Sequence, residues 1–230
     1  MSLSRLMFGL ACCAPLVAGC DSDDDAAPGG AAGTGQQGSK TNFFVSSDKS
    51  TTGNLGGLSG ADARCKALAD AAGLTGKTWR AYLSVEHDAE SGGAATNARD
   101  RIGTGPFYNA NEALLANDVA ELHARSGDAE LFVDEHGQKI PGQWAGSPGV
   151  EHDILTGSTA EGTVLANMTC ADWTSADATM AAQVGHSDGL GPGMSATPPF
   201  NSWQSSHPNE SCANTVPRGG AGRIYCFGVN

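Results

Sequence analysis

The clearest hydrophobic pattern in the chain predicts an amphipathic helix within residues 57–74. Small and apolar residues recur there at the three- and four-residue spacing of one helix face, which should turn towards the core. The members of this face are Ala61, Cys65, Leu68, Ala69 and Ala72. Ser59 and Asp62 have the spacing of a capping box, and Gly73 is a suitable residue to end the helix.

Aromatic and β-branched runs predict strands on either side of this helix, at residues 42–47, 77–84 and 222–229. Because successive side chains of a strand point to opposite faces, the second run should bury alternate residues against the helix. These residues are Trp79, Ala81 and Leu83. The last run should place Ile224 and Cys226 on one face and Tyr225 and Phe227 on the other.

The middle of the chain has weaker patterns that are interrupted by glycine and serine. Residues 117–124 predict a short helix capped by Asn117, and residues 131–140 a hairpin that turns at Gly137. Further short strands are expected at residues 152–158, 163–175 and 181–187. With 32 glycines in the chain, we expect an α+β fold with one main helix, short antiparallel strands and long loops.

The N-terminal residues 1–19 have the pattern of a secretory signal: Arg5 is followed by an apolar run too short to span a bilayer. Its end, Val17-Ala18-Gly19-Cys20, resembles a bacterial lipobox, which implies that Cys20 receives diacylglycerol and fatty acids such as palmitate. The alternative is an ordinary signal peptide cut near Ala18. Residues 20–41 are acidic and glycine-rich and predict a flexible stalk, which leaves 42–230 as one domain.

A lipid on Cys20 would anchor the protein to a membrane without spanning it, because several acyl chains together hold firmly. We therefore expect a lipid-anchored protein of the bacterial cell envelope that faces the periplasm or the cell exterior. Asp21 after the cysteine is an inner-membrane retention signal in some bacteria, but the rule is not general, and the choice of membrane stays open.

Charge and cysteine content add two constraints. Thirteen Lys and Arg stand against 25 Asp and Glu, without a basic cluster, so nucleic acid is disfavoured as a partner. The domain contains four cysteines, an even number that suggests two disulfides in an exported protein, with three possible pairings. These cysteines are Cys65, Cys170, Cys212 and Cys226. A structural zinc site is the alternative, but the chain has no C-x-x-C pair.

Three segments resemble the endostatin domain of collagens. Residues 53–84 match its glycine-rich entry, cysteine-bearing helix and R-A-aromatic-L-S strand, while 154–175 and 211–230 match its C-x-x-W and closing cysteine segments. The chain is also similar to uncharacterised bacterial lipoproteins with this endostatin-like, C-type-lectin-like fold. The resemblance implies nested disulfides, Cys65 with Cys226 and Cys170 with Cys212.

The chain departs from these families at their binding sites. It lacks the arginine clusters with which endostatin binds heparin, and residues 42–53 contain no histidine for the endostatin zinc site. The calcium-and-sugar motif of C-type lectins is absent as well, since residues 207–212 (HPNESC) match it only partially. The resemblance therefore does not imply that this chain binds heparin, the endostatin zinc ion, or a sugar through calcium.

Two short motifs could share a cation: Glu151-His152-Asp153 and His186-Ser187-Asp188. The alternative is that they are surface histidines and loop-capping aspartates. If a cofactor binds at all, calcium is the candidate, with Asp153, Asp188 and Glu210 as ligands. We expect no cofactor otherwise.

A second candidate is the loop of residues 96–109, where Asp100, Arg101 and Tyr108 could hold a polar ligand between an arginine and a ring. Alternatively, Asp100 and Arg101 form a buried structural pair. Among the tryptophans, Trp144 and Trp203 lie in turn-rich sequence and are expected as exposed stacking platforms, whereas Trp79 and Trp173 are expected in the core.

The sequence contains no G-x-S-x-G, H-E-x-x-H or phosphate-binding motif. We therefore expect a non-enzymatic module that binds a glycan or a protein partner. The rival hypotheses are an extracytoplasmic hydrolase that uses the loop histidines and acids, and a structural envelope protein.

Overall fold

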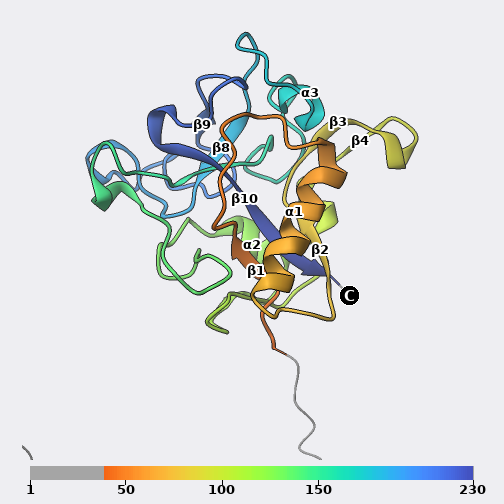
Figure 1. Ribbon diagram of the computed structural model, residues 1–230. Helices are drawn as coiled ribbons and strands as arrows, with labels where there is room; N and C mark the ends of the chain where they lie inside the picture. The colour runs from red at the N-terminus through yellow and green to blue at the C-terminus, as the bar shows by residue number, and fades with distance from the viewer. Residues whose placement is uncertain (1–38, 230) are drawn as a thin grey trace, which may run out of the picture. The chain divides into compact units, whose positions relative to one another are not determined.

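Strand β10 (Gly220–Val229), the last element of the chain, organises the main sheet (Figure 1). The sheet has the order β1-β10-β7-β8-β9, and β2 also pairs with β10. β10 runs parallel to β7 over its first half and antiparallel to β1 and β2 over its second half. One long strand thus joins two groups of short strands.

The structure is a computed structural model that describes residues 39–229, a mixed α+β domain. Its other strands are β1 (Phe43–Val45), β2 (Thr78–Ala81), β3 (Val85–Asp88), β4 (Ala94–Thr96), β5 (Phe107–Tyr108), β6 (Leu114–Ala116), β7 (Asp153–Leu155), β8 (Gln183–His186) and β9 (His207–Pro208). Its helices are α1 (Gly57–Ala71), α2 (Val119–Ala124) and α3 (Cys170–Trp173). Short 3-10 turns are η1 (Ala89–Ser91), η2 (Ala98–Arg101), η3 (Gln143–Ala145), η4 (Pro192–Met194) and η5 (Pro217–Gly219). β3 pairs with β4, and β5 with β6, in separate two-stranded sheets.

β10 is buried on both faces and therefore separates two hydrophobic clusters. Ile224 and Cys226 belong to the cluster that packs under α1, and Tyr225 and Phe227 belong to the other, which confirms the predicted alternation. The predicted core positions Trp79 and Trp173 are buried in the first cluster. Because successive side chains of β10 point to opposite faces, this one strand contributes residues to both hydrophobic clusters.

Helix α1 lies where the sequence predicted it, but its first turn is held differently. It begins after Gly56, whose left-handed backbone (φ 78°) is the N-cap, so Ser59 is not the cap residue. The Asp62 carboxylate instead accepts hydrogen bonds from the Arg101 guanidinium at 2.7 Å and the Ala81 N–H at 2.8 Å. The helix ends at Ala71, just before the left-handed Gly73 (φ 76°).

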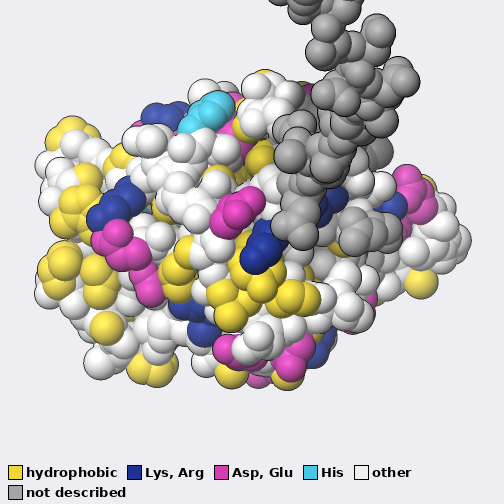
Figure 2. Space-filling view, turned by 90° about the horizontal axis from the view of Figure 1, so that it is seen from below, with side chains coloured by type: hydrophobic (Ala, Val, Ile, Leu, Met, Phe, Trp, Pro, Cys, Tyr) yellow, Lys and Arg dark blue, Asp and Glu magenta, His cyan; other side chains and the backbone are white. Residues whose placement is uncertain are grey.

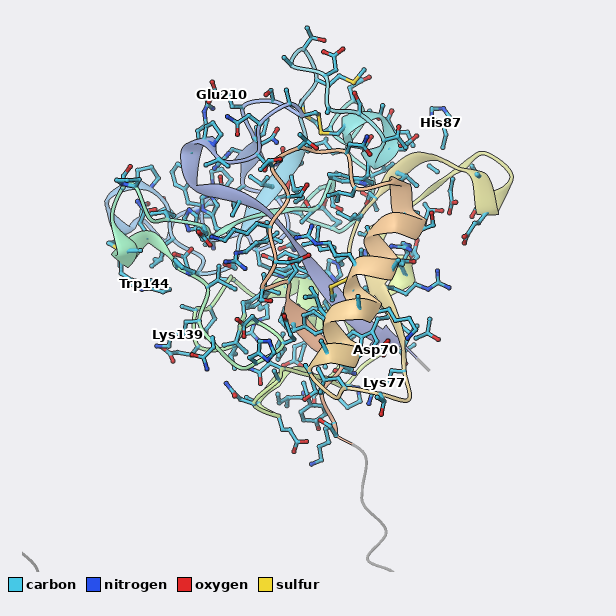
Figure 3. All side chains as sticks on the ribbon, viewed as in Figure 1. Asp70, Lys77, His87, Lys139, Trp144 and Glu210 are labelled. Atoms are coloured by element: carbon cyan, nitrogen blue, oxygen red, sulfur yellow. A yellow bond between two sulfur atoms is a disulfide. The ribbon has the colours of Figure 1, made fainter. Side chains whose placement is uncertain are left out.

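Charges of both signs are mixed on the surface. On the face drawn in Figure 2, Lys and Arg side chains lie scattered among Asp and Glu side chains. The outer side of α1 carries an ion pair between Lys66 and Asp70, and Figure 3 labels Asp70 there. Exposed pairs of this kind contribute little to stability.

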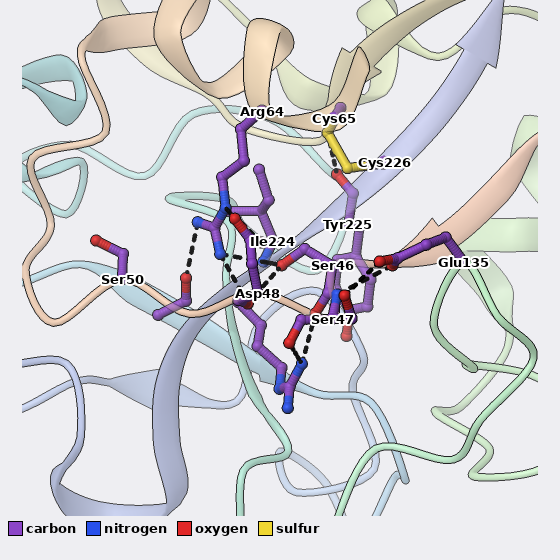
Figure 4. Close-up of polar contacts among 12 residues, drawn as sticks. Ser46, Ser47, Asp48, Ser50, Arg64, Cys65, Glu135, Ile224, Tyr225 and Cys226 are labelled. Atoms are coloured by element: carbon purple, nitrogen blue, oxygen red, sulfur yellow. Dashed lines mark hydrogen bonds and ion pairs between the residues drawn. A yellow bond between two sulfur atoms is a disulfide. The ribbon is translucent and has the colours of Figure 1, made fainter. Parts of the chain in front are cut away.

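Two arginines tie the segment after β1 to the rest of the domain (Figure 4). Arg64 of α1 donates to the Asp48 carboxylate at 2.7 Å and to the Ser46 hydroxyl at 3.2 Å. Arg223 of β10 donates to the carbonyls of Ser46 and Ser47 at 2.6 and 2.7 Å. The segment is thereby held from both sides of β10.

The cysteines form two disulfides, Cys65–Cys226 and Cys170–Cys212. This is the pairing that the resemblance implied, and it leaves no thiolate of these four for a zinc site. The first bridge joins α1 to β10, and the second joins α3 to the segment after β9. Disulfides are typical of domains that fold in oxidising compartments.

Several local predictions were wrong. Residues 163–175 were expected to form a strand but contain α3, in which four consecutive residues from Cys170 to Trp173 have positive φ. Residues 131–140 form a tight turn with one bridge, Val133 to Lys139, in place of a longer hairpin. Helix α2 is capped by Asp118, whose carboxylate accepts from the Glu121 N–H, and not by Asn117.

The folded part begins before residue 42, because Thr41 is buried and its hydroxyl donates to the Asn109 carbonyl. The predicted signal, the lipobox with Cys20 and most of the stalk lie outside the described residues. Within residues 39–229, no helix is both long and apolar enough for a membrane crossing.

Candidate metal centre

Three neighbouring strands bring histidines together at one edge of the main sheet. Asp153 begins β7, and His152 precedes it; His186 ends β8 and lies opposite Asp153 in the antiparallel register. His207 begins β9, on the other side of β8. Strand pairing therefore positions residues from three distant parts of the chain.

The Nε2 atoms of the three imidazoles lie around the Asp153 carboxylate. The Nε2 atoms of His152 and His186 each lie 3.3 Å from Asp153 Oδ1, and that of His207 lies 3.6 Å from Oδ2. The Nε2 atoms of His186 and His207 are 3.0 Å apart. One ligand atom from each of His152, Asp153 and His186 thus lies within 4.8 Å of the others, and His207 adds a third imidazole beside His186.

The opposite nitrogen of each ring is already occupied by an oxygen acceptor, which fixes the tautomer. The acceptors are the Asp188 carboxylate for His152 at 2.7 Å, the Phe200 carbonyl for His186 at 3.0 Å and the Pro208 carbonyl for His207 at 2.9 Å. With Nδ1 as the donor in these contacts, a neutral ring presents a lone pair at Nε2. The contact between the Nε2 atoms of His186 and His207 then requires either a shared cation or a hydrogen on one of the two atoms. Histidine ligands of metal ions are oriented by such contacts.

Asp153 is the least satisfied polar side chain in this region. It is 2% exposed, and neither carboxylate oxygen finds a hydrogen-bond partner within residues 39–229. A buried carboxylate without hydrogen bonds is costly unless a cation compensates its charge. Facing three imidazole lone pairs, Asp153 completes a donor set for a positive ion.

Asp188 supports the centre from behind His152. It is buried, and its carboxylate also accepts hydrogen bonds from the Gln143 N–H at 2.7 Å and the Leu190 N–H at 3.0 Å. Burial acts to raise the pKa of Asp188, but the hydrogen bonds from His152 and these two N–H groups outweigh it, and the pKa lies below its usual range. An ionised Asp188 makes the imidazole of His152 a stronger donor to a metal.

The distances fit a tetrahedral ion. Donors bound tetrahedrally at about 2.0–2.1 Å from zinc lie roughly 3.3–3.4 Å from one another. Three Nε2–carboxylate separations of 3.3, 3.3 and 3.6 Å and the His186–His207 separation of 3.0 Å are close to that value, and one ligand atom from each of His152, Asp153 and His186 lies within 4.8 Å of the others. The rings of His152 and His186 are stacked 4.2 Å apart at 13°, so one of them has to turn before both Nε2 lone pairs meet one ion. Imidazole donors suit zinc, copper, nickel and iron, whereas calcium takes oxygen ligands, so the predicted calcium does not fit this donor set.

A pocket of about 1010 Å³ opens beside this cluster, and all three histidine rings line it. Glu151 lines the pocket too, but its carboxylate is paired with Lys49 and Arg223. His207 is the most accessible of the ligands, with a quarter of its side chain exposed. A ligand in the pocket could therefore reach the ion.

The structure brings four of the predicted site residues together: His152, Asp153, His186 and Asp188. The alternative that these were surface histidines was wrong, because both rings are buried, whereas Asp188 does cap loop N–H groups, those of Gln143 and Leu190. Trp144 is 48% exposed, as predicted, and its ring lies against Gly142 close to the Asp188 carboxylate.

Trp203 is not an exposed platform, contrary to the prediction. It is fully buried, its ring packs against Tyr82 and Tyr225, and its indole N–H donates to the Leu122 carbonyl at 3.0 Å. The turn-rich sequence around Trp203 therefore folds back over the core.

The predicted loop site at residues 96–109 does not assemble. The Arg101 guanidinium turns inward and pairs with Asp62, whereas Asp100 is exposed and accepts a hydrogen bond from Asn97. The predicted Asp100–Arg101 pair is therefore wrong, although Arg101 is structural. Tyr108 is half-buried beneath the ammonium of Lys40.

Glu210 is exposed on a loop, and Figure 3 places it far from Trp144. His207 was not among the predicted site residues, although it lies only three positions before Glu210. The position of His207 in the sequence does not connect it with His152 and His186. The pairing of β8 with β9 brings it to them.

Comparisons with known proteins do not assign this centre. No protein-family model matches the chain, and no curated protein does.

Proposed function

We propose that the domain is a non-catalytic, metal-dependent binding module of the bacterial cell envelope. A transition metal ion of the zinc class is held by His152, Asp153, His186 and His207, and it binds a ligand that enters the adjoining pocket. The observation that carries this proposal is the convergence of three Nε2 atoms on the buried, unpaired carboxylate of Asp153.

The pocket also favours a second candidate, a metal-dependent hydrolase. Such an enzyme needs a group that accepts a proton from the metal-bound water. Among the described lining residues, the one carboxylate is Glu151, and Lys49 and Arg223 both hold it. Binding without turnover is therefore the better supported function.

The lectin-like fold and the lipid anchor form part of the same proposal. The two nested disulfides support the endostatin-like, C-type-lectin-like fold and an extracytoplasmic location. The lipobox supports attachment through Cys20.

Labelling of cells with a palmitate analogue should mark the wild-type chain and not its Cys20→Ala variant, because that cysteine is the acceptor of the lipid. The readout is the label on the purified protein. Equal label on both chains, or none on the wild type, would contradict lipid anchoring.

Replacing His207 by alanine should weaken zinc binding by at least about tenfold, because one of four donors is lost. The measurement is a competition titration of the full chain with a chelating dye, after the metal has been stripped and its content determined. The wild type should bind one zinc ion per chain. His207 is partly exposed, so its truncation should leave the fold intact.

The matched control is His87→Ala, a histidine with 77% of its side chain exposed on β3. It should bind zinc like the wild type. Equal losses in both variants, or no zinc bound by the wild type, would refute the metal centre.

A further inference from the structure

The pocket beside the metal centre has mainly apolar walls. Six of its lining residues are Pro148, Val150, Pro192, Phe200, Val216 and Pro217. Val216 is 56% exposed and adds apolar surface to the rim of the pocket. These walls favour a ligand with an apolar body over a sugar, whose hydroxyl groups would lose hydrogen bonds to water there.

Arg218 supplies a free positive charge at the lip of this pocket. It is exposed on η5 and lines the pocket, and it forms no ion pair or hydrogen bond with the other residues in the range 39–229. The remaining arginines of this range all donate to a carboxylate or a backbone carbonyl: Arg64, Arg80, Arg99, Arg101, Arg125 and Arg223. Arg218 is therefore the guanidinium available to a ligand.

The same turn reaches the metal ligands. A Cβ on Gly219 would lie 3.3 Å from His152 Nε2 and 3.1 Å from the Val150 side chain. Gly219 also has a φ of 104°, which side-chain-bearing residues rarely adopt. Glycine at this position keeps the approach from the pocket to the centre clear, one residue away from Arg218.

The charges around the pocket favour an anionic ligand. A divalent ion is balanced by the carboxylates of Asp153 and of Asp188 behind His152, and Arg218 adds a positive charge that no carboxylate within residues 39–229 offsets. Glu151 is compensated by its two cationic partners, Lys49 and Arg223. The chain as a whole carries a formal charge of −12, so a guanidinium at a pocket, unpartnered among the described residues, is a local exception.

We infer that the pocket binds a carboxylate ligand with an apolar body, whose carboxylate lies between the metal ion and Arg218. The inference rests on the proposed metal centre. Both a small apolar acid and the C-terminus of an apolar peptide offer this chemistry, and a guanidinium forms strong charge-assisted hydrogen bonds with either.

The test uses the full chain loaded with cobalt, whose visible absorption changes when a ligand joins the ion. The probes are 3-phenylpropionate, its neutral amide, acetate, and the peptide N-acetyl-Ala-Phe with a free or an amidated C-terminus. Both apolar carboxylates should bind and change the spectrum. The amides and acetate should bind at least about tenfold more weakly, because each lacks either the charge or the apolar body.

Arg218→Ala should weaken binding of 3-phenylpropionate by about tenfold and leave cobalt affinity unchanged. Arg218→Lys should restore part of the loss. The matched control Lys66→Ala removes a positive charge from the exposed face of α1 and should have no effect. Alanine retains the Cβ of Arg218, so the backbone of the turn is not further strained.

The outcomes separate the two proposals. A chain that binds cobalt but binds the amides as well as the carboxylates overturns the carboxylate inference and leaves the metal centre intact. Inorganic phosphate that binds as tightly as 3-phenylpropionate overturns it too. A chain that takes up no cobalt overturns both. If the inference holds, the tighter of the two carboxylate probes identifies the source as a small acid or a peptide C-terminus.

Discussion

Replacing Asp153 by asparagine should strongly weaken metal binding and, at the same time, stabilise the metal-free protein. Zinc affinity should fall by more than about 100-fold, because the anionic ligand is lost. Without metal, the free energy of unfolding should rise by about 1–3 kcal/mol, since a buried, unpaired charge is replaced by an amide of the same shape. The amide N–H groups can also donate to the imidazole Nε2 atoms that face residue 153.

Urea denaturation with and without a chelator, together with a zinc titration, measures both effects. The matched control is Asp62→Asn, because Asp62 is a carboxylate with good partners in Arg101 and the Ala81 N–H. That variant should lose about 1–3 kcal/mol and keep its zinc affinity. If Asp153→Asn instead destabilised the metal-free chain and still bound zinc, Asp153 would be structural.

Removing the Cys65–Cys226 disulfide should produce the largest loss of stability among single changes to the covalent framework. The bridge joins residues 161 apart, and the chain-entropy model gives about 5 kcal/mol for such a loop against about 4 kcal/mol for the 42-residue separation of Cys170–Cys212. Small domains have a total stability of about 5–15 kcal/mol, so either loss is severe. Urea denaturation of the two double-alanine variants measures the difference.

For metal binding, the two disulfides should rank in the reverse of their order for stability. Cys212 follows β9, and its N–H donates to the Met180 carbonyl just before β8. Loss of Cys170–Cys212 should therefore loosen the strands that position His186 and His207 and weaken zinc binding more than loss of Cys65–Cys226. Equal zinc affinities in the two variants at a temperature where both are folded would contradict this assignment.

The elements that could be predicted from the sequence are those with a strong local period. Alternation in β10 and the helical face of α1 correctly gave the faces that are buried, because both elements pack through a single repeating pattern. The disulfide pairing came from a family resemblance, since four cysteines alone allow three pairings.

The left-handed turn of α3 could not be predicted, because distant residues stabilise it. The Asp172 carboxylate accepts hydrogen bonds from the N–H groups of Glu86 and His87, and Cys170 is held by the disulfide to Cys212. Four successive residues outside the usual backbone region are tolerated only where such contacts compensate. Trp203 was misplaced for a similar reason, since its partners Tyr82, Leu122 and Tyr225 are remote in sequence.

The candidate centre was predicted in part. The pairs His152-Asp153 and His186-Asp188 were visible as neighbours in the sequence, and their shared cation was a hypothesis. The burial of these residues and the addition of His207 follow from the order of β7, β8 and β9, which no local pattern encodes. The sequence also suggested calcium, whereas the imidazole donors favour a metal of the zinc class.

X-ray absorption of the zinc-loaded full chain at the zinc edge tests the metal centre directly. We expect a first shell of three imidazole nitrogens and one carboxylate oxygen at about 2.0–2.1 Å, with the multiple-scattering pattern of histidine rings. The imidazole contribution should fall by one third in His207→Ala and stay complete in His87→Ala. A shell that contains sulfur, or oxygen alone, would contradict the centre formed by His152, Asp153, His186 and His207.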